Sequence, residues 1–133
     1  MKKGVLLNSN ISRVVSQMGH FDTLTIGDAG LPVPDGVERI DLALKMGVPS
    51  FLDAFETVMC ELCAQKITIA KEASEKNKEL FDFFSSYCDK NRIQLVQVSH
   101  EEFKKLTKYS KAIIRTGECK PYANVILESG VTF

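Results

Sequence analysis

Two histidines, His20 and His100, are the side chains of this sequence best suited to acid-base chemistry. They are the only histidines in the chain, and each falls at a junction between predicted elements. Imidazole titrates nearest to neutral pH, so either ring could give or take a proton. For His20 a structural role stays open, because a histidine just after a helix C-terminus interacts favourably with the helix dipole.

Further polar residues stand beside predicted strands. Asp28 follows one predicted strand, His100 follows another, and Tyr122 and Asn124 lie around a third loop. Ligands of open α/β sheets bind beyond the carboxyl ends of the strands, which makes these positions candidates for a binding site. Asp28 taken alone could equally be an ordinary turn residue.

The known cofactor motifs are absent. The segment Gly27-Asp28-Ala29-Gly30 does not match the G-x-G-x-x-G fingerprint, and the phosphate-binding loop G-x-x-x-x-G-K-[ST] does not occur. Neither the G-x-S-x-G elbow nor the H-E-x-x-H zinc motif is present. We therefore expect no metal and no nucleotide or other cofactor.

The cysteines Cys60 and Cys63 form a C-x-x-C pair that has to be weighed separately. A structural zinc site would show a second close pair of ligands, and the remaining cysteines, Cys88 and Cys119, are scattered singly. A thioredoxin-like pair would stand at the start of a helix, whereas this one falls near the end of an apolar helical stretch. We expect buried, reduced thiols. A redox or zinc protein is the alternative.

Composition and charge narrow the function classes. The chain has 133 residues, of which 44% are hydrophobic, and 17 basic side chains balance 17 acidic ones. This balance offers no electrostatic footprint for nucleic acid or an anionic membrane, and it suits a neutral substrate. The first eight residues contain too short an apolar run for a signal peptide or a membrane span. We expect one domain over residues 1–133, in the cytoplasm.

Predicted strands and helices alternate along the whole chain. Apolar spacing predicts helices at about 9–18, capped by Ser9 or Asn10, at 51–59, capped by Ser50, at 74–89, and after a cap at Ser99. Strands are predicted at 22–27, 37–42, 66–70, 93–98, 111–116 and 124–127. This order predicts an α/β fold, a single-domain three-layer α/β/α arrangement with a mostly parallel, mixed central sheet. The aromatic stripe between residues 80 and 88 is expected in the core.

The junction segments, read together and in order, resemble the D-ribose pyranase family. The segments are NSNIS (8–12), MGHFDTL (18–24), GDAGLPVP (27–34), RIDLAL (39–44), GVPSF (47–51), GECKPYAN (117–124) and GVTF (130–133). The match extends from residue 2 to the last residue. This family is related to the fucose mutarotases, which also carry a histidine after a glycine and an aspartate-alanine pair after the next strand.

The resemblance implies an isomerase that converts free D-ribose between its pyranose and furanose rings. His20 matches the family's catalytic acid. The family's substrate-binding positions fall on Asp28, His100, Tyr122, Ala123 and Asn124, with Lys104 as a possible accessory residue. The resemblance also implies a ring-shaped homo-oligomer, expected to be a decamer, with sites between neighbouring subunits.

Opening a cyclic hemiacetal removes a proton from the anomeric hydroxyl and delivers one to the ring oxygen. His20 is expected to donate the proton, Asp28 to orient His20 or to hold sugar hydroxyls, and His100 or a water to act as the base. The apolar tail, residues 131–133, could dock on a neighbouring subunit or on its own domain. A non-catalytic sugar-binding module and a mutarotase acting on fucose are the alternatives.

Overall fold

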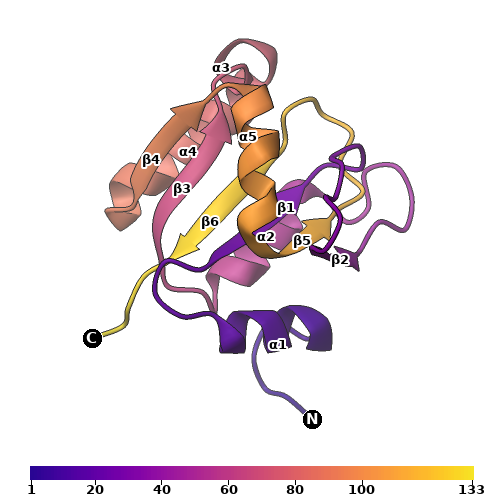
Figure 1. Cartoon of the computed structure of the whole chain (residues 1–133), viewed down its shortest axis with the longest axis vertical. Coiled ribbons are helices and arrows are strands. Elements are labelled where there is room, and N and C mark those ends of the chain that lie inside the picture. Colours follow the sequence, from indigo (N-terminus) through magenta and orange to yellow (C-terminus); the bar gives the residue numbers. More distant parts are fainter.

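The six strands form one sheet in the order β2-β5-β1-β6-β3-β4, seen in the computed structural model of residues 1–133 (Figure 1). Strand β6 pairs antiparallel with both neighbours, and the remaining neighbours pair parallel. The predicted α/β class with a mostly parallel, mixed sheet is therefore confirmed. The strands are β1 (Thr23–Gly27), β2 (Glu38–Asp41), β3 (Ala64–Ala70), β4 (Gln94–Val98), β5 (Ser110–Arg115) and β6 (Val125–Ser129).

The helices begin where polar caps satisfy their first backbone N–H groups. Ser50 forms a capping box with Asp53, and Ser99 accepts the N–H of Glu102, as the sequence predicts. The cap of the first helix is Asn8, one residue before the two predicted candidates. The helices are α1 (Ser9–Gln17), α2 (Phe51–Met59), α3 (Ala73–Lys76), α4 (Lys78–Asn91) and α5 (His100–Leu106), followed by the short 3-10 helix η1 (Thr107–Tyr109). None of them is long and apolar enough to span a bilayer.

The single helix predicted at residues 74–89 is wrong, because the chain breaks at Asn77 into α3 and α4. Asn77 has φ −148° and ψ 62°, outside the helical region. Its side-chain oxygen accepts the N–H of Leu80, and its amide donates to the carbonyl of Pro121 at 2.9 Å. An asparagine side chain can hydrogen-bond to backbone groups in place of the helical hydrogen bonds. Here these hydrogen bonds end α3 and connect the start of α4 to the distant loop that contains Pro121.

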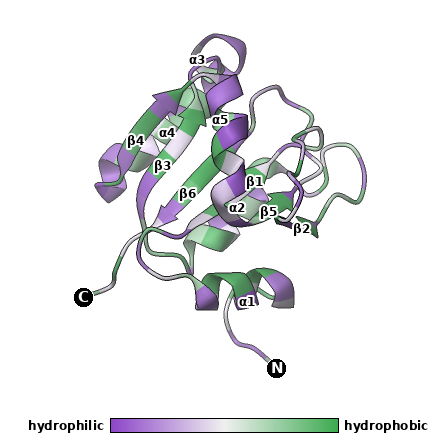
Figure 2. Cartoon of the chain, viewed as in Figure 1, coloured by the Kyte–Doolittle hydropathy of each residue, from purple (hydrophilic) through white to green (hydrophobic).

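Helices cover both faces of the sheet, as predicted for a three-layer fold. The larger core lies between the sheet and α1, α2 and α4, and a smaller one lies under α5 on the other face (Figure 1). The apolar colours lie along the middle of the strands, while α5 in front of the sheet is mostly polar (Figure 2). The aromatic stripe is core as expected: Leu80, Phe84 and Cys88 are buried, and Phe81, Phe83 and Tyr87 pack against them.

The expectation that the cysteines are buried is wrong for three of the four. Cys60, Cys63 and Cys119 are exposed, and all four are free thiols. Cys60 and Cys63 lie in the turn between α2 and β3, outside the apolar face of the helix. Only Cys88 is buried, and its burial raises the pKa of the thiol to about 11.

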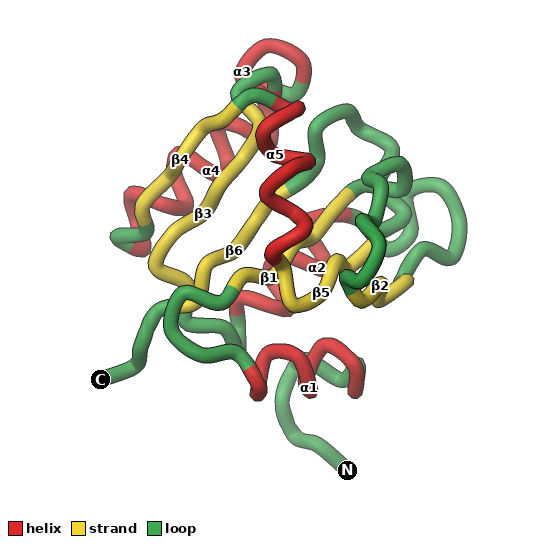
Figure 3. The backbone as a smooth tube through the Cα atoms, viewed as in Figure 1, coloured by secondary structure: helices red, strands yellow, loops and turns green.

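The antiparallel strand β6 decides which loops meet. Because β6 runs against β1, the loop before β6 lies at the carboxyl end of β1, and the tail after β6 lies at the amino end (Figure 3). The first of these ends is called the carboxyl edge and the second the amino edge, after the direction of β1. A five-residue strand separates the two edges by about 17 Å.

Candidate active site

The centre of the carboxyl edge is a pair of hydrogen bonds between Asp28 and Asn124. Asn124 Oδ1 accepts the backbone N–H of Asp28 at 2.9 Å, and Asn124 Nδ2 donates to Asp28 Oδ2 at 2.9 Å. Asp28 Oδ1 accepts the N–H of Gly30. Asn124 is 1% exposed, whereas Asp28 is half-buried, so the buried amide holds a carboxylate at the surface. Each carboxylate oxygen keeps lone pairs with which it could accept a hydroxyl.

His100 and Tyr122 form an aromatic pair at the same edge. Their ring centroids are 5.1 Å apart at 90°, an edge-to-face contact, and the imidazole also stacks on Phe103 at 6.4 Å. His100 Nδ1 is buried and has no hydrogen-bond partner in the protein. Buried polar atoms normally have partners, so this nitrogen is a candidate contact for a ligand.

Glu72 fixes the backbone at His100. Its two carboxylate oxygens accept the N–H of His100 at 3.1 and 3.0 Å. This backbone hydrogen bond is the main reason that the pKa of Glu72 lies below its usual range, and it outweighs the opposing effect of desolvation. The first turn of α5, which carries the imidazole, is thereby tied to the loop after β3.

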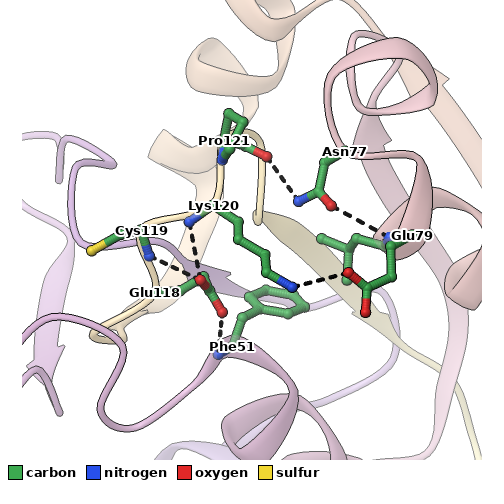
Figure 4. A network of polar contacts seen from close by, with 8 residues as sticks. Phe51, Asn77, Glu79, Glu118, Cys119, Lys120 and Pro121 are labelled. Carbon is green, nitrogen blue, oxygen red and sulfur yellow. Dashed lines mark hydrogen bonds and ion pairs between the residues drawn. The ribbon is translucent and has the colours of Figure 1, made fainter.

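The loop that carries Tyr122 and Asn124 is held by Glu118 (Figure 4). The Glu118 carboxylate accepts backbone N–H groups from Phe51 at 3.4 Å, from Cys119 at 2.9 Å and from Lys120 at 3.0 Å. Burial acts to raise the pKa of Glu118, but these three donors outweigh it and lower the pKa below its usual range. The carboxylate therefore remains ionised and joins the loop to the N-terminus of α2.

Two further contacts complete the loop. Lys120 pairs with Glu79 at 3.0 Å, and Asn77 donates to the carbonyl of Pro121 (Figure 4). Tyr122 has a φ of 57°, a conformation that a bulky side chain rarely adopts and that the surrounding structure must impose. The contacts on both sides of Tyr122 supply that constraint.

His20 lies at the amino edge, away from the other predicted site residues. Its Nε2 lies 3.0 Å from Gln65 Oε1, and its ring stacks on Phe21 with centroids 3.8 Å apart. Because β1 separates His20 from Asp28, Asp28 does not orient His20 within one chain. That part of the sequence interpretation is corrected: Gln65 is the residue that contacts the His20 ring.

The structure thus brings Asp28, His100, Tyr122, Ala123 and Asn124 to the carboxyl edge and leaves His20 at the amino edge. Lys104 lies one turn after His100 on α5. Lys104 forms an ion pair with Glu101, one turn away on α5, at 2.6 Å. The described structure has no group of three or more histidine, cysteine, aspartate or glutamate side chains arranged to hold a metal ion.

The residues that hold the site in place could not be recognised from local sequence. Gln65, Glu72, Asn77 and Glu118 act through hydrogen bonds to partners far away in the sequence. Asn77 gave one available signal, since an asparagine inside a predicted helix is a frequent break point. Nothing in the local sequence distinguishes the other three from ordinary surface side chains.

The sequence as a whole is that of a known family. The chain matches the RbsD / FucU transport protein family over residues 1–132, and it belongs to that family.

Relatives within the family are similar over their whole length. The D-ribose pyranase of Thermoanaerobacter sp. (strain X514) is 53% identical over 133 residues, and that of Haemophilus influenzae (strain 86-028NP) is 52% identical over 139 residues; both alignments cover all of both chains. The structure of Bacillus subtilis RbsD complexed with D-ribose matches with a TM-score of 0.95 at 46% identity, again over all of both chains. A fucose mutarotase from Streptococcus pneumoniae, solved with L-fucose, covers all of both chains at 20% identity and a TM-score of 0.79, and so shares the fold.

Proposed function

We propose that this protein is an isomerase that interconverts the pyranose and furanose forms of free D-ribose. The observation that carries the proposal is the carboxyl edge, where Asp28, Asn124, His100 and Tyr122 gather in a chain similar over its full length to relatives named D-ribose pyranase. The solved relative with D-ribose bound, at 46% identity, supports ribose as the sugar.

The carboxyl edge has the chemistry of a site for a neutral polyol. Asp28 accepts hydrogen bonds from sugar hydroxyls, Tyr122 offers a phenol that donates or accepts, and the unpaired Nδ1 of His100 offers a further contact. The aromatic pair of His100 and Tyr122 gives the apolar C–H faces of a sugar a surface to pack on. Ala123, which is buried between Tyr122 and Asn124, contributes close packing rather than a polar group.

Ring opening breaks the bond between the anomeric carbon and the ring oxygen. His20 donates a proton to the departing ring oxygen, and His100 or a water takes the proton of the anomeric hydroxyl, which becomes the carbonyl. Closure through another hydroxyl reverses both transfers and returns the other ring size. Positioned acid-base catalysis typically contributes about 10²–10⁴-fold, enough for a reaction that also proceeds slowly in water.

His20 can take part only if it reaches the carboxyl edge of another copy. The amino edge of one subunit and the carboxyl edge of the next are different surfaces, so this contact is heterologous, and repeating it around an axis closes a ring. Exposed apolar side chains lie at the amino edge: Phe21, which stacks on His20, is 63% exposed, and Phe133 in the tail is fully exposed. The tail does not bury Phe133 on its own domain, which favours the docking alternative. We expect a ring-shaped homo-oligomer, with a decamer as the specific assembly.

The state of the cysteines indicates the cellular compartment in which the protein acts. Four free cysteines, three of them exposed, suit a reducing compartment, where disulfides rarely form. We therefore expect the protein to act in the cytoplasm, on sugar that has already entered the cell.

Exchange NMR of D-ribose with and without the protein tests the proposal. The wild-type protein is expected to accelerate exchange between pyranose and furanose anomeric signals, and His20→Ala to lose that acceleration while still binding ribose. A protein that binds ribose but leaves its exchange unchanged would be a sugar-binding module instead. Acceleration for L-fucose but not D-ribose would reassign the substrate.

A further inference from the structure

The amino edge contains a chain of hydrogen bonds that the reaction described so far does not use. His20 Nε2 lies 3.0 Å from Gln65 Oε1, and Gln65 Nε2 donates to Glu128 Oε1 at 2.9 Å. Glu128 in turn forms an ion pair with Lys66. These contacts link three segments that are distant in the sequence, namely the loop before β1, strand β3 and strand β6.

The charge of Glu128 determines which group donates and which accepts in each of these hydrogen bonds. Burial acts to raise the pKa of Glu128, but its contacts with Lys66 and Gln65 outweigh burial and hold the pKa below the usual range. An ionised carboxylate only accepts hydrogen bonds, so the NH₂ group of Gln65 must face Glu128. The carbonyl oxygen of Gln65 then faces His20, and since it also only accepts, His20 Nε2 must carry a hydrogen.

The backbone is shaped to bring Gln65 to this position. The register of β3 against β6 shifts between Ala64 and Lys66, so that Gln65 is the extra residue of a β-bulge opposite Glu128 and Ser129. A bulge turns a side chain away from its regular direction, and bulges are frequent beside active sites. Gly130 leaves room for it, because a Cβ there would lie 3.1 Å from the Cβ of Gln65.

The other nitrogen of the ring remains available. Phe21 stacks on one side of the imidazole with an interplanar angle of 20°, and its backbone N–H is fixed by the carbonyl of Ser129 at 3.0 Å. Within the chain, the single hydrogen bond of the His20 ring is the one at Nε2. Nδ1 is therefore the atom left to face a sugar.

We propose that Gln65 and Glu128 are positioning residues that hold His20 in its Nε2–H form, so that Nδ1 is the atom that exchanges the proton with the sugar. The inference rests on the proposed function. The imidazolium gives its Nδ1 proton to the ring oxygen as the bond to the anomeric carbon breaks. The neutral ring that remains carries its hydrogen on Nε2, which is the form that Gln65 stabilises. Ring closure returns the proton to Nδ1.

The ¹⁵N spectrum of histidine-labelled full-length protein reports the tautomer directly. Above the titration range of the ring, wild-type His20 is expected to show a protonated Nε2 and an unprotonated Nδ1. The chain has only one other histidine, so a His100→Gln variant assigns the signals. Magic-angle spinning of the sedimented protein makes the measurement independent of the size of the assembly.

Two variants disrupt the hydrogen bonds from Glu128 through Gln65 to His20, and a third serves as the matched control. Gln65→Met removes the acceptor, and Glu128→Gln lets the Gln65 amide turn over, because a glutamine at 128 can both donate and accept. Both are expected to give a mixture of tautomers and to lower the exchange rate at saturating ribose roughly tenfold, with KM little changed. Lys78→Met removes an exposed ion pair with Asp82 on α4, away from these contacts, so the tautomer and the rate should stay as in wild type.

The outcomes separate this inference from the function on which it rests. A wild-type Nδ1–H tautomer, or wild-type exchange rates in both Gln65→Met and Glu128→Gln, would overturn the positioning role while leaving the isomerase intact. Should wild type fail to accelerate ribose exchange at all, the proposed function fails, and the tautomer spectra of the same proteins still decide whether Gln65 and Glu128 orient the ring. Near-UV circular dichroism of each variant excludes misfolding as the cause of a lost rate.

Discussion

The two edges of the sheet hold polar clusters of different construction. At the carboxyl edge, the Asn124 amide is buried and its loop is tied down by Glu118 and Asn77. At the amino edge, His20 is exposed, next to an exposed phenylalanine and an apolar tail. Under the proposed function, the carboxyl edge is a preformed binding half, whereas the amino edge presents its imidazole outward.

This difference explains how one small sheet could supply both binding and proton transfer. Preformed polar groups lose little conformational entropy when a ligand binds, so rigidity favours the binding half. The donor needs to approach a sugar held by another copy, so exposure favours the catalytic half. The predictions that follow test this division of labour, starting with the one expected to have the largest effect.

Mixing two inactive variants tests whether the two edges act across a subunit contact. His20→Ala and Asp28→Ala are each expected to lose about 10²-fold or more of the exchange rate. After unfolding and refolding together in equal amounts, about one quarter of the sites should contain both intact edges, and a matching share of activity should return. Exchange NMR measures the recovery. Variants refolded separately and then mixed are the control, and no recovery after joint refolding would contradict a site shared between two chains.

Truncating the buried amide tests the rigidity of the carboxyl edge. Asn124→Ala leaves the Asp28 N–H without its partner and is expected to cost about 1–3 kcal/mol of unfolding free energy. Ribose binding should weaken in addition, because the Asp28 carboxylate loses the Nδ2 donor that orients it. Denaturant titration and calorimetry with ribose measure the two effects. Asn91→Ala, at an exposed asparagine at the end of α4, should change the unfolding free energy by less than about 0.5 kcal/mol.

The pH dependence of stability tests the anchor of the same loop. The pKa of Glu118 is lowered in the folded protein, so its stabilising effect is complete above the usual glutamate pKa and is lost as pH falls through the folded value. In Glu118→Gln this loss should be absent. The Tm of wild type should therefore fall more steeply than that of the variant from about pH 6 to about pH 3.5. Parallel curves would mean that Glu118 titrates alike in both states.

The smallest effect is expected at the C-x-x-C pair, whose one side-chain hydrogen bond runs from Cys63 Sγ to the carbonyl of Val131 in the tail. Cys60→Ala and Cys63→Ala should each leave ribose exchange unchanged and alter stability by less than about 0.5 kcal/mol. A thiol reagent should modify the three exposed cysteines quickly and Cys88 slowly, since burial raises the pKa of that thiol to about 11. Bound zinc, or exchange that depends on these thiols, would revive the redox or zinc alternative.

Much of the fold could be read from local sequence. Apolar periodicity located every strand, and the capping residues Ser50 and Ser99 marked two helix starts correctly. The break at Asn77 escaped the prediction because its partner, the Pro121 carbonyl, is 44 residues away. Polar residues at strand ends correctly grouped Asp28, His100, Tyr122 and Asn124, but they did not reveal that Asn124 directly contacts Asp28.

The sequence by itself determined the α/β class, the approximate elements and the identity of the polar residues, because periodicity and capping act between neighbours along the chain. Only the tertiary structure decided that β6 runs against β1, which places Asn124 beside Asp28 and the tail beside His20. It likewise decided the bulge that aims Gln65 at the imidazole. Strand order, direction and register depend on pairing between distant segments. The sequence pattern of one strand does not identify the strand with which it pairs.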